Sequence, residues 1–267
     1  MLTDLQKIEI VDKYSLGTTI KELVSIYGTT ISNIRSLLIR RGVKIRENRH
    51  RKYNFNENFF DVIDNEEKAY WLGFIFGDGG ISKYSLRLEL SNKDLNHVYK
   101  FINTINLNTP IIKTNKNCVL ITANSKKMIT GLSKYGIIQN KTYLTNSIPL
   151  NLISKQLQKH FIRGIFDADG WIVEHKRKYN KSQFEYGFSS YHINILHQIQ
   201  NWIKENNVIN ISNGYIKERI KGNQKVCQFI IGGNNNFQKI TDLIYSNSNV
   251  FLERKKNKIS QFMQIIH

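Results

Sequence analysis

The sequence predicts an α+β fold: two pseudo-symmetric αββαββα repeats preceded by a small all-α domain. A short motif occurs twice, as WLGFIFGDGG over residues 71–80 and as FIRGIFDADGW over residues 161–171. The acids that end the two copies, Asp78 and Asp169, are far enough apart for each copy to have an αβ unit of its own. Alternating strand patterns follow each copy, and helical patterns occupy the beginning of the chain.

Composition is typical of a nucleic-acid-binding protein. The net charge is +18, from 39 basic and 21 acidic residues, and it is spread along the chain, unlike the charge of a membrane-surface helix. No apolar run approaches a membrane span, and the charged N-terminus does not resemble a secretory signal. Cys118 and Cys227 occupy similar places in the two repeats, which suggests buried strand residues, not a disulfide framework. We expect an intracellular protein in a reducing compartment, with an organelle, a phage or a virus among the open origins.

Residues 1–43 are expected to form a helix-turn-helix domain. Helical spacing predicts three helices over residues 3–15, 20–27 and 30–41, with Gly28 as the turn before the third. The third helix would enter a major groove; the alternative is a three-helix bundle that binds protein. In the third helix, Ile31, Ile34 and Leu38 are expected to face inward. The apolar residues that mark the first two helices by their spacing are Leu5, Ile8, Val11, Tyr14, Ile20, Leu23, Val24 and Tyr27. The residues expected to contact bases or phosphates are Ser32, Asn33, Arg35, Ser36 and Arg40.

A basic linker is expected over residues 44–66, followed by the repeats at 67–150 and 151–267. Such charge runs are often only solvated, but between two DNA-binding units this one can follow the backbone or enter a minor groove. Asp64 is expected to cap the first motif helix, with Glu66 and Glu67 in its first turn. The linker residues expected to contact DNA are Arg46, Arg49 and Arg51.

The two motif copies are predicted to be helices that pack against each other. Each copy has small residues four positions apart on one helix face, which lets two backbones approach closely. Glycine just after each acid is a common helix stop, so Asp78 and Asp169 would meet at the C-terminal ends of the two helices. Two carboxylates there repel each other, and hard divalent cations such as Mg²⁺ relieve the repulsion. A plain turn after a core helix would explain one copy, but not two. The small residues are Gly73, Gly77, Gly164 and Ala168.

The two copies resemble the paired signature motifs of the LAGLIDADG homing endonucleases in their single-chain, two-repeat form. The second copy, IRGIFDADG, is close to the signature. The first, WLGFIFGDG, has Phe76 in place of the acid at the sixth position but keeps the last acid. The resemblance covers roughly residues 53–267, and it implies that the two repeats form a DNA-binding saddle.

The resemblance also implies a metal site. By analogy, Asp78 and Asp169 are metal ligands and catalytic residues, and the backbone carbonyls of Gly77 and Ala168 add ligands. The expected cofactor is Mg²⁺, for which Mn²⁺ or Ca²⁺ can substitute, and the expected chemistry is metal-assisted phosphodiester hydrolysis.

A basic residue is expected near each scissile phosphate, to stabilise developing charge or polarise water. In the first repeat the family pattern of a lysine after a helix and a glycine turn indicates Lys141. The matching segment FLERKKN indicates Lys255, with Lys256 as the alternative. Asn92 and Ser190 end equivalent strands and are weaker candidates for positioning water. The histidines have no metal spacing, so we expect no zinc site.

The strand patterns predict sheets with one polar face. In ISKYSLRLELS, Leu86, Leu88 and Leu90 alternate with polar residues, and the hairpin VEHKRKYNKSQFEYGFSS is longer and strongly basic. Such a face can lie in a major groove, although solvated surface is an equally good interpretation of any single residue. The expected base-contacting residues are Ser85, Arg87, Glu89, Lys176, Arg177, Gln183, Glu185, Tyr215, Lys217, Arg219 and Gln228.

Together these patterns and the resemblance lead us to expect a site-specific, Mg²⁺-dependent endonuclease. It would act as a monomer on a long double-stranded DNA target and cut both strands, leaving short 3′ overhangs. Two other classes stay open: a catalytically silent DNA-binding regulator of the same fold, and a maturase that binds intron RNA. A nicking enzyme with one impaired half-site is also open.

Overall fold

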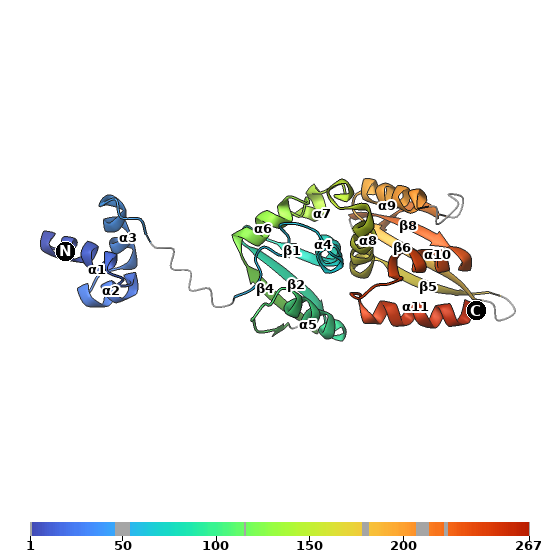
Figure 1. The fold of residues 1–267 in the computed structure, drawn as a ribbon, viewed down its shortest axis with the longest axis horizontal. Helices are drawn as coiled ribbons and strands as arrows, with labels where there is room; N and C mark the ends of the chain where they lie inside the picture. The colour runs from blue at the N-terminus through green and yellow to red at the C-terminus, as the bar shows by residue number, and fades with distance from the viewer. Residues whose placement is uncertain are drawn as a thin grey trace. The chain divides into compact units, whose positions relative to one another are not determined.

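The computed structural model describes residues 2–45, 54–114, 116–177, 182–206, 214–221 and 224–266. The chain divides into two compact units, residues 1–52 and 53–267, each described by itself (Figure 1). The described part of the first unit forms α1 (Asp4–Ser15), α2 (Ile20–Tyr27) and α3 (Ile31–Arg40). The expected amino-terminal helices are therefore present.

Side-chain caps define the three helices of the first unit. Thr3 and Thr19 each form a capping box, and Thr30 accepts a hydrogen bond from the Asn33 amide. The core consists of Ile10, Tyr14, Ile20, Leu23, Ile34, Leu37 and Leu38.

Three of the apolar residues that mark these helices are exposed, and one of them, Ile31, was expected to face inward. Leu5 is 81% exposed, Ile8 51% and Ile31 47%. Helix α1 has apolar residues on two faces, and Ile8 lies about 200° around the helix from the buried Ile10. Only the face that carries Ile10 packs against the other helices, so spacing alone did not identify the buried face.

The second unit contains both repeats in the expected order. The first consists of α4 (Glu66–Asp78), β1 (Gly79–Ile81), β2 (Ser85–Ser91), η1 (Asn92–Asp94), α5 (Leu95–Thr104), β3 (Ile112–Lys113), β4 (Cys118–Asn124), α6 (Lys126–Ser133) and α7 (Lys141–Leu144). The second consists of η2 (Leu150–Leu152), α8 (Lys155–Asp169), β5 (Trp171–Lys176), β6 (Ser182–Ser190), α9 (Ile193–Glu205), β7 (Gly214–Lys221), β8 (Gln224–Gly232), α10 (Asn234–Tyr245) and α11 (Glu253–Ile266). Two αββαββα units are therefore confirmed.

Each repeat builds one antiparallel sheet, and the two sheets have matching topology. The strand orders are β1-β2-β4-β3 and β5-β6-β8-β7. Ser91 pairs with Cys118 in one sheet and Ser190 with Cys227 in the other, so the cysteines are equivalent as expected. Cys227 is buried, but Cys118 is only partly buried. Strand β7 continues past Cys227, where Glu218 is its partner, whereas β3 ends at Lys113, which pairs with Val119.

One face of each sheet is covered by helices. Helices α5 and α6 contact β2, and α9, α10 and α11 contact β6 (Figure 1). Along β2, Leu86, Leu88 and Leu90 are buried, while Arg87 and Glu89 are exposed, as the alternating pattern predicted. Among the described residues of β2, the side chains on the opposite face are therefore polar and lie at the surface.

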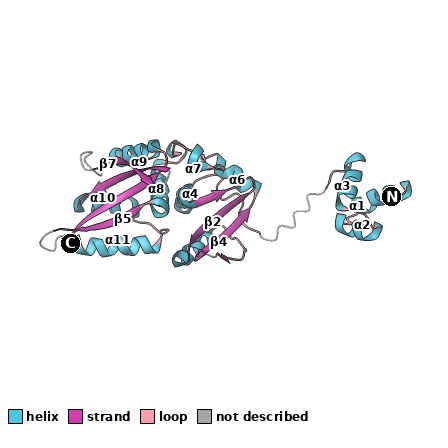
Figure 2. Cartoon of the chain, turned by 180° about the vertical axis from the view of Figure 1, so that it is seen from behind, coloured by secondary structure: helices cyan, strands magenta, loops and turns pink. Residues whose placement is uncertain are grey.

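Helices α4 and α8 lie side by side between the two sheets (Figures 1 and 2). From Ala69 to Phe76 every residue of α4 is buried, because one side of this helix meets its own sheet and the other meets α8. Asn65 caps α4 by accepting from the Lys68 amide. The expectation for Asp64 was wrong: its carboxylate instead accepts from the Asn65 amide group and the Lys68 ammonium.

Candidate metal and nucleic-acid site

Glycines allow α4 and α8 to pack backbone against backbone. A Cβ atom at Gly73 would lie 2.0 Å from the carbonyl oxygen of Phe161, and one at Gly164 would lie 2.1 Å from that of Tyr70. Near the helix ends, a Cβ at Gly77 would lie 2.5 Å from the Cβ of Ala168. The predicted pairing of the two motif helices is thus present, and all four small residues are at or beside the contact.

Both helices end at their acids, but the following glycines are needed for a different reason than expected. Gly79 has φ −72° and Gly170 has φ −81°, so neither takes the left-handed conformation that usually favours glycine at a helix end. A Cβ at Gly79 would lie 2.5 Å from Ile75 Cγ2, and one at Gly170 would lie 2.2 Å from Phe166 Cδ2. Glycine is required here for space.

Asp78 and Asp169 come together at the paired helix ends. A Cβ at Gly77, the neighbour of Asp78, would lie 2.9 Å from Asp169 Oδ2. Partial burial, which removes water from the carboxylate, and secondly repulsion from Asp169 raise the pKa of Asp78 to about 6. The protein around Asp169 also raises the pKa of that carboxyl. Both residues stay exposed to solvent, so their desolvation is partial and a ligand can reach them.

Lys141 places its ammonium group at the end of α4. Its side chain is buried, and Nζ donates to the carbonyl oxygen of Gly77 at 2.6 Å. Asn140, with φ 59°, turns the chain into α7 so that Lys141 begins this short helix. Burial lowers the pKa of Lys141, and attraction to Asp169 and Asp78 opposes that effect.

Lys255 occupies the corresponding place at the end of α8. Its Nζ donates to the carbonyl oxygens of Phe166 and Gly170, both at 2.5 Å, and burial lowers its pKa to about 8. Unpaired carbonyls at a helix C-terminus carry partial negative charge, so each helix end attracts a cation. Lys256 instead lies over the Tyr245 ring, 5.0 Å from its centroid. Of the two candidate lysines, Lys255 is thus the one at the helix end.

The donor atoms at these helix ends fit a hard divalent cation. The two carboxylates and the carbonyl oxygens of Gly77 and Ala168 are all oxygen donors, which suit Mg²⁺ or Ca²⁺. The Gly77 carbonyl already accepts from Lys141, but a carbonyl oxygen has a second lone pair. Within the described ranges, no group of three or more His, Cys, Asp or Glu side chains is placed to hold a metal ion. Further ligands at this site would have to come from water or from DNA phosphates.

A pocket of about 480 Å³ runs from the helix ends to the second sheet. Lys141 and Asp169 line one part of it, and Arg219 and Gln228 on the sheet line another. Ser190 also lines the pocket, where its hydroxyl accepts from the His192 amide. Asn92, the other residue considered for positioning water, is exposed in η1 and its amide donates to Asn117. The pocket thus connects the acids of the helix ends to polar residues of the sheet.

The candidate DNA-contacting residues lie at the surface wherever they are described. All five on α3 are exposed. On the sheets, Ser85, Gln183, Glu185 and Gln228 are half-buried, while Arg87, Glu89, Lys176, Arg177, Tyr215, Lys217 and Arg219 are exposed. The linker candidates Arg46, Arg49 and Arg51 lie outside the described residues.

Several of these sheet residues already have partners. Arg177 donates to Gln183 Oε1 from Nε at 3.0 Å and from Nη2 at 2.6 Å. His175 lies 3.4 Å from a carboxylate oxygen of Glu185. The contacts that these residues make with DNA stay predictions.

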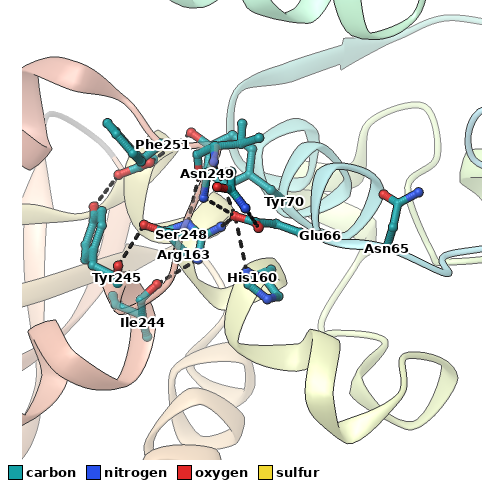
Figure 3. Close-up of polar contacts among 12 residues, drawn as sticks. Asn65, Glu66, Tyr70, His160, Arg163, Ile244, Tyr245, Ser248, Asn249 and Phe251 are labelled. Carbon is teal, nitrogen blue, oxygen red and sulfur yellow. Dashed lines mark hydrogen bonds and ion pairs between the residues drawn. The ribbon is translucent and has the colours of Figure 1, made fainter.

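A buried ion pair between the repeats was missed in the sequence. Arg163 of α8 is fully buried and donates to Ile244 O at 2.8 Å, Val250 O at 2.9 Å and Glu66 Oε1 at 2.6 Å (Figure 3). Glu66 of α4 also accepts from the Asn249 amide at 2.7 Å. The one available signal was the presence of charged residues, Arg163 among them, within the mostly apolar run over residues 161–168. Its partners, far away in sequence, were not predictable.

Comparisons with known proteins agree with this geometry. The fold and the paired helix ends define a protein of LAGLIDADG architecture. The model of the WhiA LAGLIDADG-like domain matches residues 67–147 and 158–247, more than half of the chain, and the chain belongs to that family.

Solved structures of LAGLIDADG homing endonucleases share the fold. The enzyme I-LtrWI bound to target DNA is 13% identical, with a TM-score of 0.52, and the match covers 79% of this chain and 90% of that one. I-SmaMI bound to uncleavable DNA is 14% identical, with a TM-score of 0.53 over 77% of this chain and 90% of that one. At this level of identity the likeness shows the fold alone.

Curated relatives match in Methanocaldococcus jannaschii. An uncharacterized protein is 29% identical over 154 residues, which are 53% of each chain. A replication factor C small subunit is 28% identical over 45% of this chain and 7% of its own length. A probable translation initiation factor IF-2 is 30% identical over 40% of this chain and 10% of its own. The chain therefore spans about half the length of the first relative and a tenth or less of the other two. In the described part of this chain, no helix is both long and apolar enough to cross a membrane.

Proposed function

We propose that this protein is a site-specific, Mg²⁺-dependent endonuclease that cuts both strands of double-stranded DNA. One observation carries the proposal: the paired ends of α4 and α8 hold two acids and two buried lysines. Each lysine donates to the carbonyl oxygens of its own helix end. Burial, and then repulsion from Asp169, raises the pKa of Asp78 to about 6, and perturbed carboxyl pKa values of this kind cluster at functional sites.

Each group at the helix ends has a role in phosphodiester hydrolysis. Bound divalent cations would lower the pKa of a water and neutralise charge on the attacking and leaving oxygens. Asp78 and Asp169, with the Gly77 and Ala168 carbonyls, would hold these cations. The buried ammonium groups of Lys141 and Lys255 would stabilise the negative charge that develops on the phosphate. Two such half-sites, one for each strand, account for double-strand cleavage with short 3′ overhangs by a monomer.

The polar sheet faces and the first unit would supply DNA affinity. The net charge of +18 favours contacts with phosphate along a long target, and alternating polar residues on the sheets suit major-groove readout. The three amino-terminal helices would act as a helix-turn-helix that extends the contacted site, with Arg35 and Arg40 on the exposed side of α3. We place the protein in a reducing intracellular compartment.

The family match favours a second candidate, a DNA-binding regulator. The matching model is that of the WhiA domain, and WhiA proteins are regulators. Regulators of this fold resemble the endonucleases but have lost the acids, whereas this chain keeps both acids and both lysines. The nuclease is therefore the better-supported proposal. An intron RNA maturase stays a further possibility that the same surfaces allow.

A plasmid assay separates the two candidates. The substrate is a supercoiled plasmid that carries the DNA flanking the gene, incubated with protein and Mg²⁺. Wild type is expected to produce linear DNA, and Asp78→Asn with Asp169→Asn is expected to abolish cutting while leaving DNA binding in Ca²⁺ intact. If wild type binds this DNA tightly but leaves it supercoiled in both Mg²⁺ and Mn²⁺, the protein is a regulator. Stronger binding to intron RNA than to DNA would instead favour the maturase.

A further inference from the structure

The second motif helix has a buried acid that the first lacks. Asp167 is 1% exposed, and Phe76 has the equivalent position in α4. A buried carboxylate is unfavourable unless hydrogen bonds compensate for lost water. Burial of the Asp167 carboxylate therefore requires hydrogen-bond donors around it.

Three donors surround the Asp167 carboxylate. Oδ2 accepts from the Tyr70 hydroxyl at 2.8 Å and from the Leu252 amide at 2.8 Å, and Oδ1 accepts from the Tyr245 hydroxyl at 2.5 Å. Tyr70 belongs to α4, Tyr245 ends α10, and Leu252 directly precedes α11. Asp167 thus ties three separate segments to the last turn of α8.

The contact with Leu252 determines where Lys255 lies. The Lys255 amide donates to the carbonyl oxygen of Leu252 at 3.1 Å, so the first turn of α11 starts from the residue that Asp167 holds. From that turn, the Lys255 side chain reaches the carbonyls of Phe166 and Gly170, on either side of Asp167 in the sequence. We propose that Asp167 is the positioning residue of Lys255, and that the half-site containing Lys255 depends on it while the half-site containing Lys141 does not. This inference rests on the proposed nuclease function.

Contacts around Leu252 restrict the same segment further. Arg254 donates to both carboxylate oxygens of Asp94, from Nε at 3.0 Å and from Nη2 at 3.1 Å. Lys100 forms an ion pair with Glu253. Both partners belong to the first repeat, so residues 252–255 are fixed across the repeat interface.

The first half-site has a different construction. Phe76 packs its ring against Phe161, 5.9 Å between centroids, and has no group that can accept a hydrogen bond. Lys141 starts α7, a helix of four residues in which Tyr143 and Leu144 are exposed. Loss of the Asp167 carboxylate should therefore disturb one lysine and leave the other in place.

The test combines lysine labelling with strand-resolved cleavage in full-length Asp167→Asn protein. Asparagine keeps the shape but puts an NH₂ group opposite donors that need an acceptor. Lys255 is expected to undergo reductive methylation several-fold faster than in wild type, by mass spectrometry of the folded protein, with Lys141 unchanged as internal reference. On the plasmid, one particular strand should be cut roughly ten- to a hundredfold more slowly, so that nicked circles accumulate.

Thr241→Val is the matched control, because it removes a buried hydrogen bond in the same repeat, 2.7 Å between the Thr241 and Tyr186 hydroxyls, without touching Lys255. Tyr245→Phe removes one of the three donors to Asp167 and should show the same pattern more weakly, which keeps the test available if Asp167→Asn fails to fold. The inference is overturned if Lys255 labels no faster than in the control, or if both strands slow equally. The labelling experiment does not require cleavage activity. If wild type does not cut DNA, the proposed function is contradicted, but the labelling rates still show whether Asp167 positions Lys255.

Discussion

The close approach of α4 and α8 at Gly73 gives the first prediction, for Gly73→Ala. The new Cβ would lie 2.0 Å from the backbone carbonyl oxygen of Phe161, whereas Cβ atoms in proteins essentially never approach another heavy atom within 3.0 Å. Helices α4 and α8 would have to separate by about 1 Å or more, and neither backbone can turn aside as a side chain can. The acids at the two helix ends would separate with them.

The expected loss of stability is about 2 kcal/mol. Overpacking of this kind costs about 1–3 kcal/mol, and the clash with backbone places Gly73→Ala at the upper end of that range. Alanine is favoured over glycine within a helix by about 1 kcal/mol, which offsets part of the cost. Urea denaturation followed by circular dichroism measures the difference.

Gly232→Ala is the control for that measurement. Its new Cβ would meet its nearest neighbour, a carboxylate oxygen of Glu185, at 4.0 Å, so its stability should stay within about 0.5 kcal/mol of wild type. If Gly73→Ala is as stable as this control, the two helices are not packed backbone against backbone and the pairing is incorrect.

Three further predictions follow from the same structure. Arg163→Met leaves Glu66 without its buried partner and should lower the free energy of unfolding by about 3–5 kcal/mol. A change below about 1 kcal/mol in urea denaturation would show that the Arg163–Glu66 ion pair does not hold the two repeats together. The raised pKa of Asp78 means that the folded state binds more protons than the unfolded state between the ordinary pKa of 3.8 and about 6. Without divalent cations, wild type should therefore lose stability relative to Asp78→Asn as pH rises from 4 to 6.5, and the opposite sign would be inconsistent with the raised pKa. Removal of residues 1–52 should weaken DNA binding and reduce its salt dependence, while cutting at high protein concentration persists. Fluorescence anisotropy at about 50 to 200 mM salt measures the binding, and an unchanged salt slope would show that the first unit makes no phosphate contacts.

Local sequence patterns predicted the motif helices and the strands, because these elements depend on residues close together in the sequence. Residues four apart share a helix face and residues two apart share a sheet face, so the small pairs in the motifs and the leucines of β2 were sufficient. The same argument failed in α1, where Leu5 and Ile8 form an apolar stripe that is exposed within the described part of the first unit. Amphipathic spacing identifies a face, but the partners of the helix decide whether it is buried.

The sequence did not predict the buried hydrogen bonds of Asp167 and Arg163 beside the site, because their partners are distant in the sequence. Asp167 accepts a hydrogen bond from the Leu252 amide, and Arg163 donates one to the Val250 carbonyl oxygen. Leu252 and Val250 are far from α8 in the sequence, and only folding brings them near it. The sequence does show two charged residues, Arg163 and Asp167, four positions apart within the mostly apolar run over residues 161–168. That pattern indicates buried polar contacts but does not identify the partners.

Crowding of the two acids is itself informative about function. Asp78 and Asp169 repel each other at the negative ends of two helices, which disfavours the folded state without cations. Lys141 and Lys255 relieve part of that repulsion. A divalent cation would relieve the rest, so folding and metal binding should support each other.

The most direct test of this account is the cleavage of supercoiled plasmid, carrying the DNA that flanks the gene, by wild type and by the Asp78→Asn/Asp169→Asn double variant in Mg²⁺. Both proteins should bind the DNA equally in Ca²⁺, because neither acid is needed for contacts with the sheets. Wild type should convert the plasmid to linear DNA, and the double variant should leave it supercoiled. Linear product from the double variant at the wild-type rate would show that the paired helix ends are not the catalytic site.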